Sequence, residues 1–158
     1  MGNILRGDDG FGVEVARQLV DSAALPDFVK VIEVGIGGIH LVHELMSGYE
    51  MLVIIDAVER GSVPGTIHLL EAEAPDLADW PQEKREGFLA DTHYATPSKA
   101  MILAKALGVL PPKVFILGCQ PAAYEDLGLG LSDRVQAAIP AVIDQIRRLV
   151  AELEQKDG

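Results

Sequence analysis

Cysteine is almost absent from the sequence, which contains only Cys119 among 158 residues. A single thiol excludes an intramolecular disulfide, and such sparse cysteine is typical of proteins that stay in a reducing compartment such as the cytoplasm. No segment approaches the roughly 20 apolar residues of a membrane-spanning helix. The chain begins Met-Gly-Asn, without the charged and then apolar pattern of a signal peptide. We therefore expect a cytoplasmic protein without a membrane segment.

Positive charge is also scarce. The chain has 13 Lys and Arg against 24 Asp and Glu, which gives a formal net charge of −11. This excess opposes binding to the phosphates of nucleic acid and to anionic membrane surfaces. It favours solubility, or attraction to a basic or metal-bearing partner. We expect neither nucleic acid nor a membrane among the partners.

The length and composition are those of one globular domain. Hydrophobic residues make up 49% of the chain and charged residues 23%, as is ordinary for a protein with a substantial core. No internal repeat or interdomain linker interrupts the sequence. Residues 1–158 are therefore predicted to form a single domain.

Hydrophobic periodicity divides the chain into alternating helices and strands. Helices are predicted from Phe11 to Val20, from Ile39 to about Met46, from Pro97 to about Leu107 with Thr96 as N-cap, and after Ser132 as the cap of the last helix. Strands are predicted over 28–34, 51–55, 66–70 (at an edge of the sheet) and 113–118. The acidic stretch 71–92 lacks a sustained period and is predicted to be a long loop with a helical turn near Trp80.

This alternation predicts an α/β fold, with a twisted, mostly parallel sheet of about five strands flanked by helices on both faces. In such folds a glycine-rich loop that opens a helix follows a strand. Here only Met1 precedes Gly2. We therefore expect the first strand to be missing or truncated at the N-terminus, either because the true start lies upstream or because an upstream strand has been lost.

The stretch Gly2–Gly12 (GNILRGDDGFG) is the most unusual part of the sequence. It places four glycines and the adjacent carboxylates of Asp8 and Asp9 within eleven positions, directly before the first predicted helix. A turn with a helix cap would explain part of this pattern, because acidic residues are favourable at a helix N-terminus. Two adjacent aspartates among so many glycines exceed what one cap requires, which favours a loop that faces a ligand.

Three parts of the chain are expected to meet where ligands bind in parallel α/β sheets, outside the carboxyl ends of the strands. Asp8 and Asp9 lie where a first strand would end, Asp56 ends the apolar strand, and His93 stands between the acidic loop and the next helix. Two carboxylates and an imidazole suit a divalent ion such as nickel or zinc, or a general base with an orienting partner. Their spacing matches no compact metal signature. A cap at Asp56 and a solvated loop histidine at His93 remain the alternatives.

Other candidates fit known site patterns less well. His40 and His43 lie three residues apart on one predicted helix face, but without the His-Glu-x-x-His pattern they are interpreted as a partly exposed surface pair. The Gly35–Gly38 loop lacks the third glycine of a dinucleotide fingerprint. Cys119 follows a strand and could be a nucleophile, although a lone cysteine there is more often a buried small hydrophobe.

The opening stretch resembles the signature G-N-x-L-x-x-D-[DE]-x-x-G of the hydrogenase maturation proteases. The resemblance continues in order along essentially the whole chain. Its further elements are Gly37-Gly38 after the second strand, Asp56-Ala57 at the end of an apolar strand, Pro64-Gly65-Thr66, His93 ahead of a helix, and Gly130-Leu131-Ser132 before the last helix.

The resemblance implies a cytoplasmic endopeptidase that removes a C-terminal extension from the large-subunit precursor of a nickel-iron hydrogenase after nickel insertion. The family's metal-contacting and catalytic positions match Asp9, Asp56 and His93, with the nickel supplied by the substrate. A nickel-dependent contact would act as a check on correct loading. Asp8 is interpreted as a loop or capping residue. No residue is required to be a covalent nucleophile.

Three other functions remain open from the sequence. A small nucleotide- or phosphate-binding α/β module could use the glycine loop, although Asp8 and Asp9 would repel phosphate unless a cation intervened. A thiol hydrolase could combine Cys119 with His93. An inactive relative could escort the hydrogenase subunit without cutting it.

Overall fold

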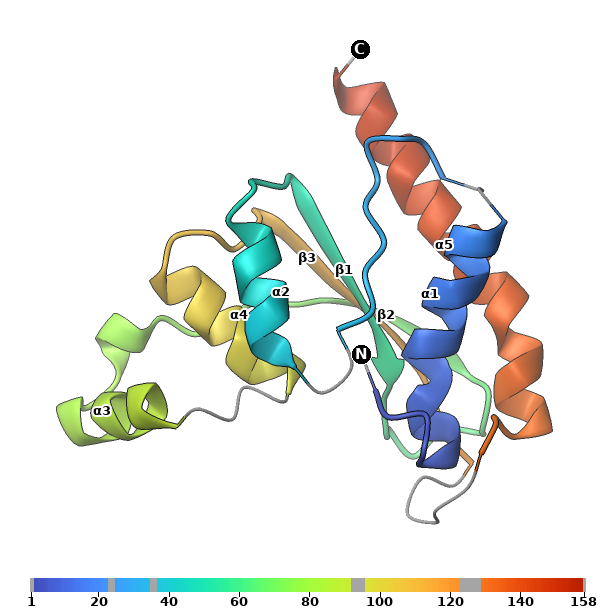
Figure 1. Ribbon diagram of the computed structural model, residues 1–158, viewed down its shortest axis with the longest axis horizontal. Coiled ribbons are helices and arrows are strands. Elements are labelled where there is room, and N and C mark those ends of the chain that lie inside the picture. Colours follow the sequence, from blue (N-terminus) through green and yellow to red (C-terminus); the bar gives the residue numbers. More distant parts are fainter. Residues whose placement is uncertain (1, 23–24, 35–36, 92–95, 123–128, 158) are drawn as a thin grey trace.

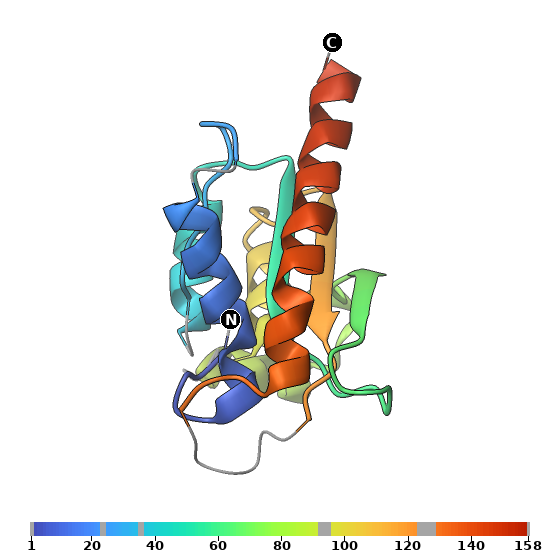
Figure 2. The same ribbon diagram turned by 90° about the vertical axis from the view of Figure 1, so that its right-hand side faces the viewer.

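A mixed β-sheet lies between two pairs of helices in the computed structural model, which describes residues 2–22, 25–34, 37–91, 96–122 and 129–157 (Figure 1). Helices α1 and α5 lie on one side of the strands, and α2 and α4 lie on the other (Figures 1 and 2). The elements in chain order are η1 (Gly7–Gly10), α1 (Phe11–Asp21), α2 (Gly38–Leu45), β1 (Met51–Ala57), β2 (Ile67–Glu71), η2 (Leu77–Asp79), α3 (Gln82–Ala90), α4 (Pro97–Ala106), β3 (Lys113–Cys119) and α5 (Asp133–Asp157).

The sheet has the strand order β1-β3-β2. Strand β1 runs parallel to β3, in a register that pairs Asp56 with Gly118. Strand β2 is antiparallel to β3 and lies at an edge of the sheet. Because β1 and β3 point the same way, the turns that follow them leave the sheet at the same edge, which is where ligands bind in α/β folds.

Alternating side chains of β1 and β3 contribute to two apolar clusters. Ile54 of β1 and Val114 of β3 belong to the cluster under α2 and α4, whereas Leu117 and Cys119 of β3 belong to the cluster under α1 and α5. Successive strand residues point to opposite faces, so this division is the consequence of apolar runs that are covered on both sides. The predicted α/β class with helices on both faces is confirmed.

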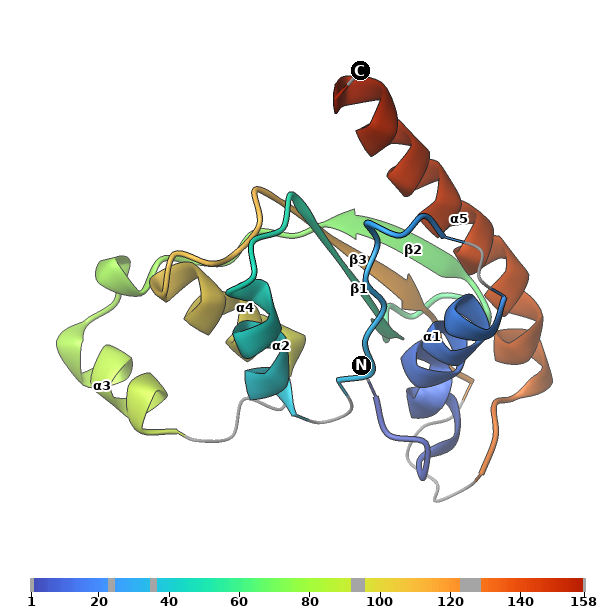
Figure 3. The same cartoon turned by 45° about the horizontal axis from the view of Figure 1, so that its top comes forward.

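The prediction of about five strands is wrong in number, since three strands form the sheet in the described part of the chain. The stretch 28–34, predicted as a strand, is an extended segment that runs between α2 and α1 (Figure 3). Val31 packs against the α1/α5 cluster and Ile32 against the α2/α4 cluster, so the alternation is real. Its described backbone bonds are local, as in the donation from Val29 N–H to Pro26 at 2.9 Å, so it joins no ladder.

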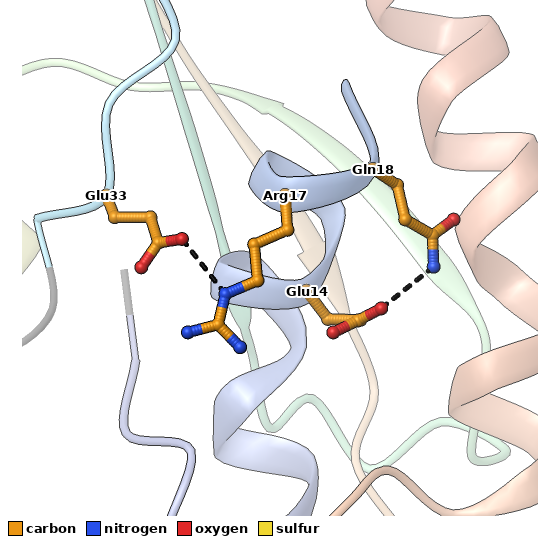
Figure 4. A network of polar contacts seen from close by, with 4 residues as sticks. All are labelled: Glu14, Arg17, Gln18 and Glu33. Atoms are coloured by element: carbon orange, nitrogen blue, oxygen red, sulfur yellow. Dashed lines mark hydrogen bonds and ion pairs between the residues drawn. The ribbon is translucent and has the colours of Figure 1, made fainter. Parts of the chain in front are cut away.

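An ion pair fastens this extended stretch to α1. Arg17 Nε donates to Glu33 Oε1 at 3.0 Å, beside the contact between Gln18 and Glu14 on the same helix (Figure 4). Both charged side chains are about half exposed. A pair of this kind contributes roughly 0–1 kcal/mol, so apolar packing rather than this ion pair holds the stretch in place.

The long loop predicted over 71–92 contains a helix that the sequence did not reveal. Helix α3 has no buried residue, and it lies away from the sheet (Figure 1). An element without a buried face has no reason to carry a hydrophobic period, which is why periodicity missed it. The helical turn predicted near Trp80 is confirmed by η2.

The N-terminus of α4 follows ordinary capping chemistry. Thr96 Oγ accepts a hydrogen bond from Lys99 N–H at 3.4 Å, and Pro97 occupies the first turn of α4. Helix α5 begins directly after Ser132, as predicted. No helix in the described residues is long and apolar enough to cross a membrane.

Candidate functional site

The opening turn folds back on itself and fixes Asp9. Asn3 N–H donates to the backbone oxygen of Asp9 at 3.2 Å and to its Oδ2 at 3.0 Å, and Asp9 N–H donates to Arg6 O at 3.2 Å. Gly2 has a φ of 130°, and a Cβ there would lie 1.9 Å from the Asp9 backbone oxygen. Only glycine fits this close approach, which explains one of the glycines in the opening stretch.

Asp56 lies close to this turn. It is the penultimate residue of β1, and its Oδ1 accepts a hydrogen bond from Ala57 N–H at 3.0 Å. A Cβ on Gly2 would be 3.7 Å from Asp56 Oδ1, so the Gly2 backbone lies beside both aspartates. The structure thus brings together Asp9 and Asp56, which are far apart in the sequence.

The surroundings of Asp56 disfavour its charged form. Burial raises the pKa of the Asp56 carboxyl above its ordinary value, and the negative charge of Asp9 raises it further, while the Ala57 N–H acts in the opposite direction. Two carboxylates that repel each other in a partly buried place form an arrangement that a divalent cation would relieve. Carboxylate oxygens with one imidazole are suitable ligands for such an ion.

His93 lies outside the described residues, so its position relative to Asp9 and Asp56 stays a prediction. The described chain on either side of it is tied together, because Lys99 Nζ of α4 donates to Asp91 Oδ2 at 2.5 Å. No group of three or more His, Cys, Asp or Glu that could hold a metal lies among the described residues. The described residues thus bring two of the three predicted ligands, Asp9 and Asp56, close to each other.

Asp8 has a structural role that is wider than the loop or cap that the sequence suggested. It is 1% exposed, and its carboxylate accepts hydrogen bonds from Ala122 N–H at 2.8 Å, Ser132 N–H at 2.7 Å and Ser132 Oγ at 2.9 Å. These donors come from the chain after β3 and from the start of α5. Asp8 therefore does more than cap its own turn, since it binds distant segments to it. Sequence reasoning missed this role because nothing local distinguishes Asp8 from Asp9.

Cys119 is buried, at 1% exposed. Burial and the nearby negative charge of Asp8 raise the pKa of its thiol to about 11, against a smaller opposite effect of the Gly65 N–H. The thiolate is the nucleophilic form, so this side chain is unsuited to attack a substrate at neutral pH. The interpretation of Cys119 as a buried small hydrophobe is confirmed.

Two further candidates from the sequence are the histidine pair and the glycine loop. His40 and His43 are exposed on α2, as expected for a surface pair. The glycine loop 35–38 lies partly outside the described residues.

Comparison with known proteins gives one consistent family. The family model described as "Hydrogenase maturation protease" matches residues 13–149, a range that includes Asp56 and His93 and begins after Asp9. The chain is 29% identical over 150 residues to the hydrogenase expression/formation protein HupD of Rhizobium leguminosarum bv. viciae, covering 95% of this chain and 71% of that protein. It is 30% identical over 152 residues to HupD of Rhodobacter capsulatus, covering 96% and 69%.

A solved structure agrees with these relatives. The crystal structure of a hydrogenase 2 maturation peptidase from a Thaumarchaeota archaeon superimposes with a TM-score of 0.65 at 30% identity, covering 94% of this chain and 93% of that one. Similarity in sequence and in fold therefore extends over nearly the whole length of the chain.

Proposed function

The chain belongs to the hydrogenase maturation protease family, and we propose that it is the endopeptidase that removes a C-terminal extension from the large-subunit precursor of a nickel-iron hydrogenase. The observation that carries the site is the meeting of Asp9 and Asp56 at the edge of the sheet where β1 and β3 end. The family match and the similarity to a solved maturation peptidase support the reaction. We expect the reaction to take place in the cytoplasm.

Asp9, Asp56 and His93 are the residues that we expect to contact the nickel of the substrate. These side chains would supply carboxylate oxygens from two residues and one imidazole nitrogen as ligands, and the precursor would supply the nickel ion together with the remaining ligands. The pKa of Asp56 is raised mainly by burial, and without a cation the repulsion between the two carboxylates adds to this effect. Binding of the precursor is therefore coupled to its nickel, which gives a check that loading is complete.

The chemistry is hydrolysis by water. In the described part of the chain the one thiol is buried and protonated at neutral pH, so no cysteine attack is proposed. A carboxylate that the bound ion leaves free could accept a proton from water, and the ion could polarise the scissile carbonyl. Both routes use the same residues.

The test is cleavage of a matched precursor with and without nickel. Intact-mass spectrometry of the nickel-loaded large subunit should show loss of a C-terminal peptide, while the nickel-free precursor should keep its mass. Cleavage of both forms would keep the protease and refute the nickel check. A loaded precursor that binds and is never cut would instead support the escort function.

A further inference from the structure

Two buried polar side chains tie the turn that carries Asp9 and the loop that follows Asp56 to one short stretch of chain, residues 120–122. One is Asp8, which is 1% exposed, and the other is Gln120, which is 3% exposed. They are the buried polar or charged side chains among the described residues. Neither is needed as a nickel ligand, and burial of a polar group is costly unless it is fully hydrogen-bonded.

Asp8 holds the Asp9 turn. It accepts from Ala122 at 2.8 Å and from the backbone and hydroxyl of Ser132 at 2.7 and 2.9 Å. Each of these partners is a donor, so a carboxylate fits and an amide does not, because the amide NH₂ would face N–H or O–H groups. Since Asp8 is bonded directly to Asp9 in the chain, the position of Asp9 depends on these contacts.

Gln120 holds the loop that follows Asp56. Its Oε1 accepts from Arg60 N–H at 2.8 Å and from Ser62 N–H at 3.2 Å, and its Nε2 donates to Glu59 Oε1 at 2.7 Å. One side chain thus satisfies three groups in a loop about 60 residues away in the sequence.

The backbone reinforces the same connection. Val58 N–H donates to Cys119 O at 2.9 Å, and a Cβ on Gly118 would lie 2.7 Å from a methyl group of Val58. The chain leaving β1 therefore crosses close over the end of β3. Both carboxylate-bearing segments are fastened to the few residues after β3, one through Asp8 and the other through Gln120.

We propose that Asp8 and Gln120 are positioning residues that set the separation of Asp9 and Asp56, so that the pair is held in place before the precursor binds. This rests on the proposed function. Groups that orient ligands in this way commonly change activity by about 10- to 100-fold when they are removed, and site residues tolerate displacements of only about 0.5 Å. The two side chains act through Asp9 and Asp56 and do not touch the reacting atoms.

The experiment compares cleavage kinetics of three variants with nickel-loaded precursor. Asp8→Asn and Gln120→Leu test the proposal, and Val142→Ala removes buried core volume on α5 as a control for loss of stability. All are assayed at a temperature where denaturant titration shows each to be folded. We expect kcat to fall at least about 10-fold for the first two with KM within about threefold, and Val142→Ala to keep its kcat.

Ser132→Ala provides a milder change, because it removes the hydroxyl donor and leaves both backbone bonds to Asp8. We expect an intermediate fall in kcat, and this variant with Gln120→Leu decides the question if Asp8→Asn does not fold. Wild-type kcat in these variants at equal folded fraction would overturn the positioning role. An inactive wild-type protein on loaded precursor would be a failure of the proposed function, so the two failures are distinguishable.

Discussion

The carboxylate of Asp8 accepts hydrogen bonds from both the backbone N–H and the hydroxyl group of Ser132, across a separation of 124 residues. Its neighbour Asp9 is only partly buried and lies beside Asp56. Two chemically identical neighbours in the sequence therefore face different surroundings. Asp8 binds the segments around Ala122 and Ser132, whereas Asp9 is the one that we propose contacts the substrate.

Replacing Asp9, Asp56 or His93 by Ala should each abolish processing while leaving the fold intact. Loss of a supporting group costs about 10- to 100-fold in metal sites, so loss of a ligand should cost at least about 100-fold. The assay is intact-mass spectrometry of nickel-loaded precursor, with circular dichroism as the check on folding. His40→Ala is the matched control, because this imidazole is exposed on α2. Normal cleavage by all three site variants would rule out the proposed ligand set.

Asp56→Asn should make the protein more stable at neutral pH. The pKa of Asp56 is raised by burial and by Asp9, so the folded state loses stability as pH rises through that folded-state pKa. An asparagine never ionises and avoids this loss. Thermal denaturation with a chelator present should therefore give a higher midpoint for the variant at pH 7. The difference should shrink toward about pH 4, near the carboxyl pKa of an unfolded chain. Equal denaturation midpoints for the variant and the wild type at pH 7 would contradict this prediction.

Cys119→Ala should cleave precursor with a kcat within about twofold of wild type, because a buried thiol with a raised pKa takes no part in the reaction. The cost should appear in stability instead, at about 1 kcal/mol, the typical effect of a point substitution. Native protein should also resist iodoacetamide at pH 7.5, and unfolded protein should react. A large loss of kcat would revive the thiol hydrolase.

Leu117→Ala should reduce the free energy of unfolding by about 2–5 kcal/mol, because the side chain is fully buried between β3 and the α1/α5 helices. Leu107→Ala is the matched control, since this leucine is 51% exposed at the end of α4 and should cost less than about 1 kcal/mol. Urea titrations of both variants give the comparison. Similar losses would mean that the core assignment is wrong.

The sequence predicted the elements whose apolar pattern is strong. Helices α1, α2, α4 and α5 and strands β1 and β3 agree with their predicted ranges to within a few residues, because each buries a regular face. The apolar pattern predicted the wrong structure where the local sequence and the packing in the folded protein favour different structures. The stretch 28–34 alternates like a strand without joining a ladder, and α3 is a helix without a fully buried residue.

The candidate site was only partly visible in the sequence. The carboxyl-end rule placed Asp9 and Asp56 together, and the structure confirms that they meet. The roles of Asp8 and Gln120 depend on contacts between segments about 60 to 124 residues apart, and no local pattern encodes these. Whether His93 completes the site stays a prediction.

The two apolar clusters have a consequence for how the molecule opens. The cluster under α1 and α5 adjoins the Asp9 turn, the cluster under α2 and α4 includes the helix that follows His93, and Asp56 stands on the sheet between them. If each cluster is a cooperative unit, amide exchange in α4 and in α1 will report separate opening events. A substrate that contacts Asp9, Asp56 and His93 would couple the opening of the two clusters. Its binding should then slow amide exchange in α1 and α4 together.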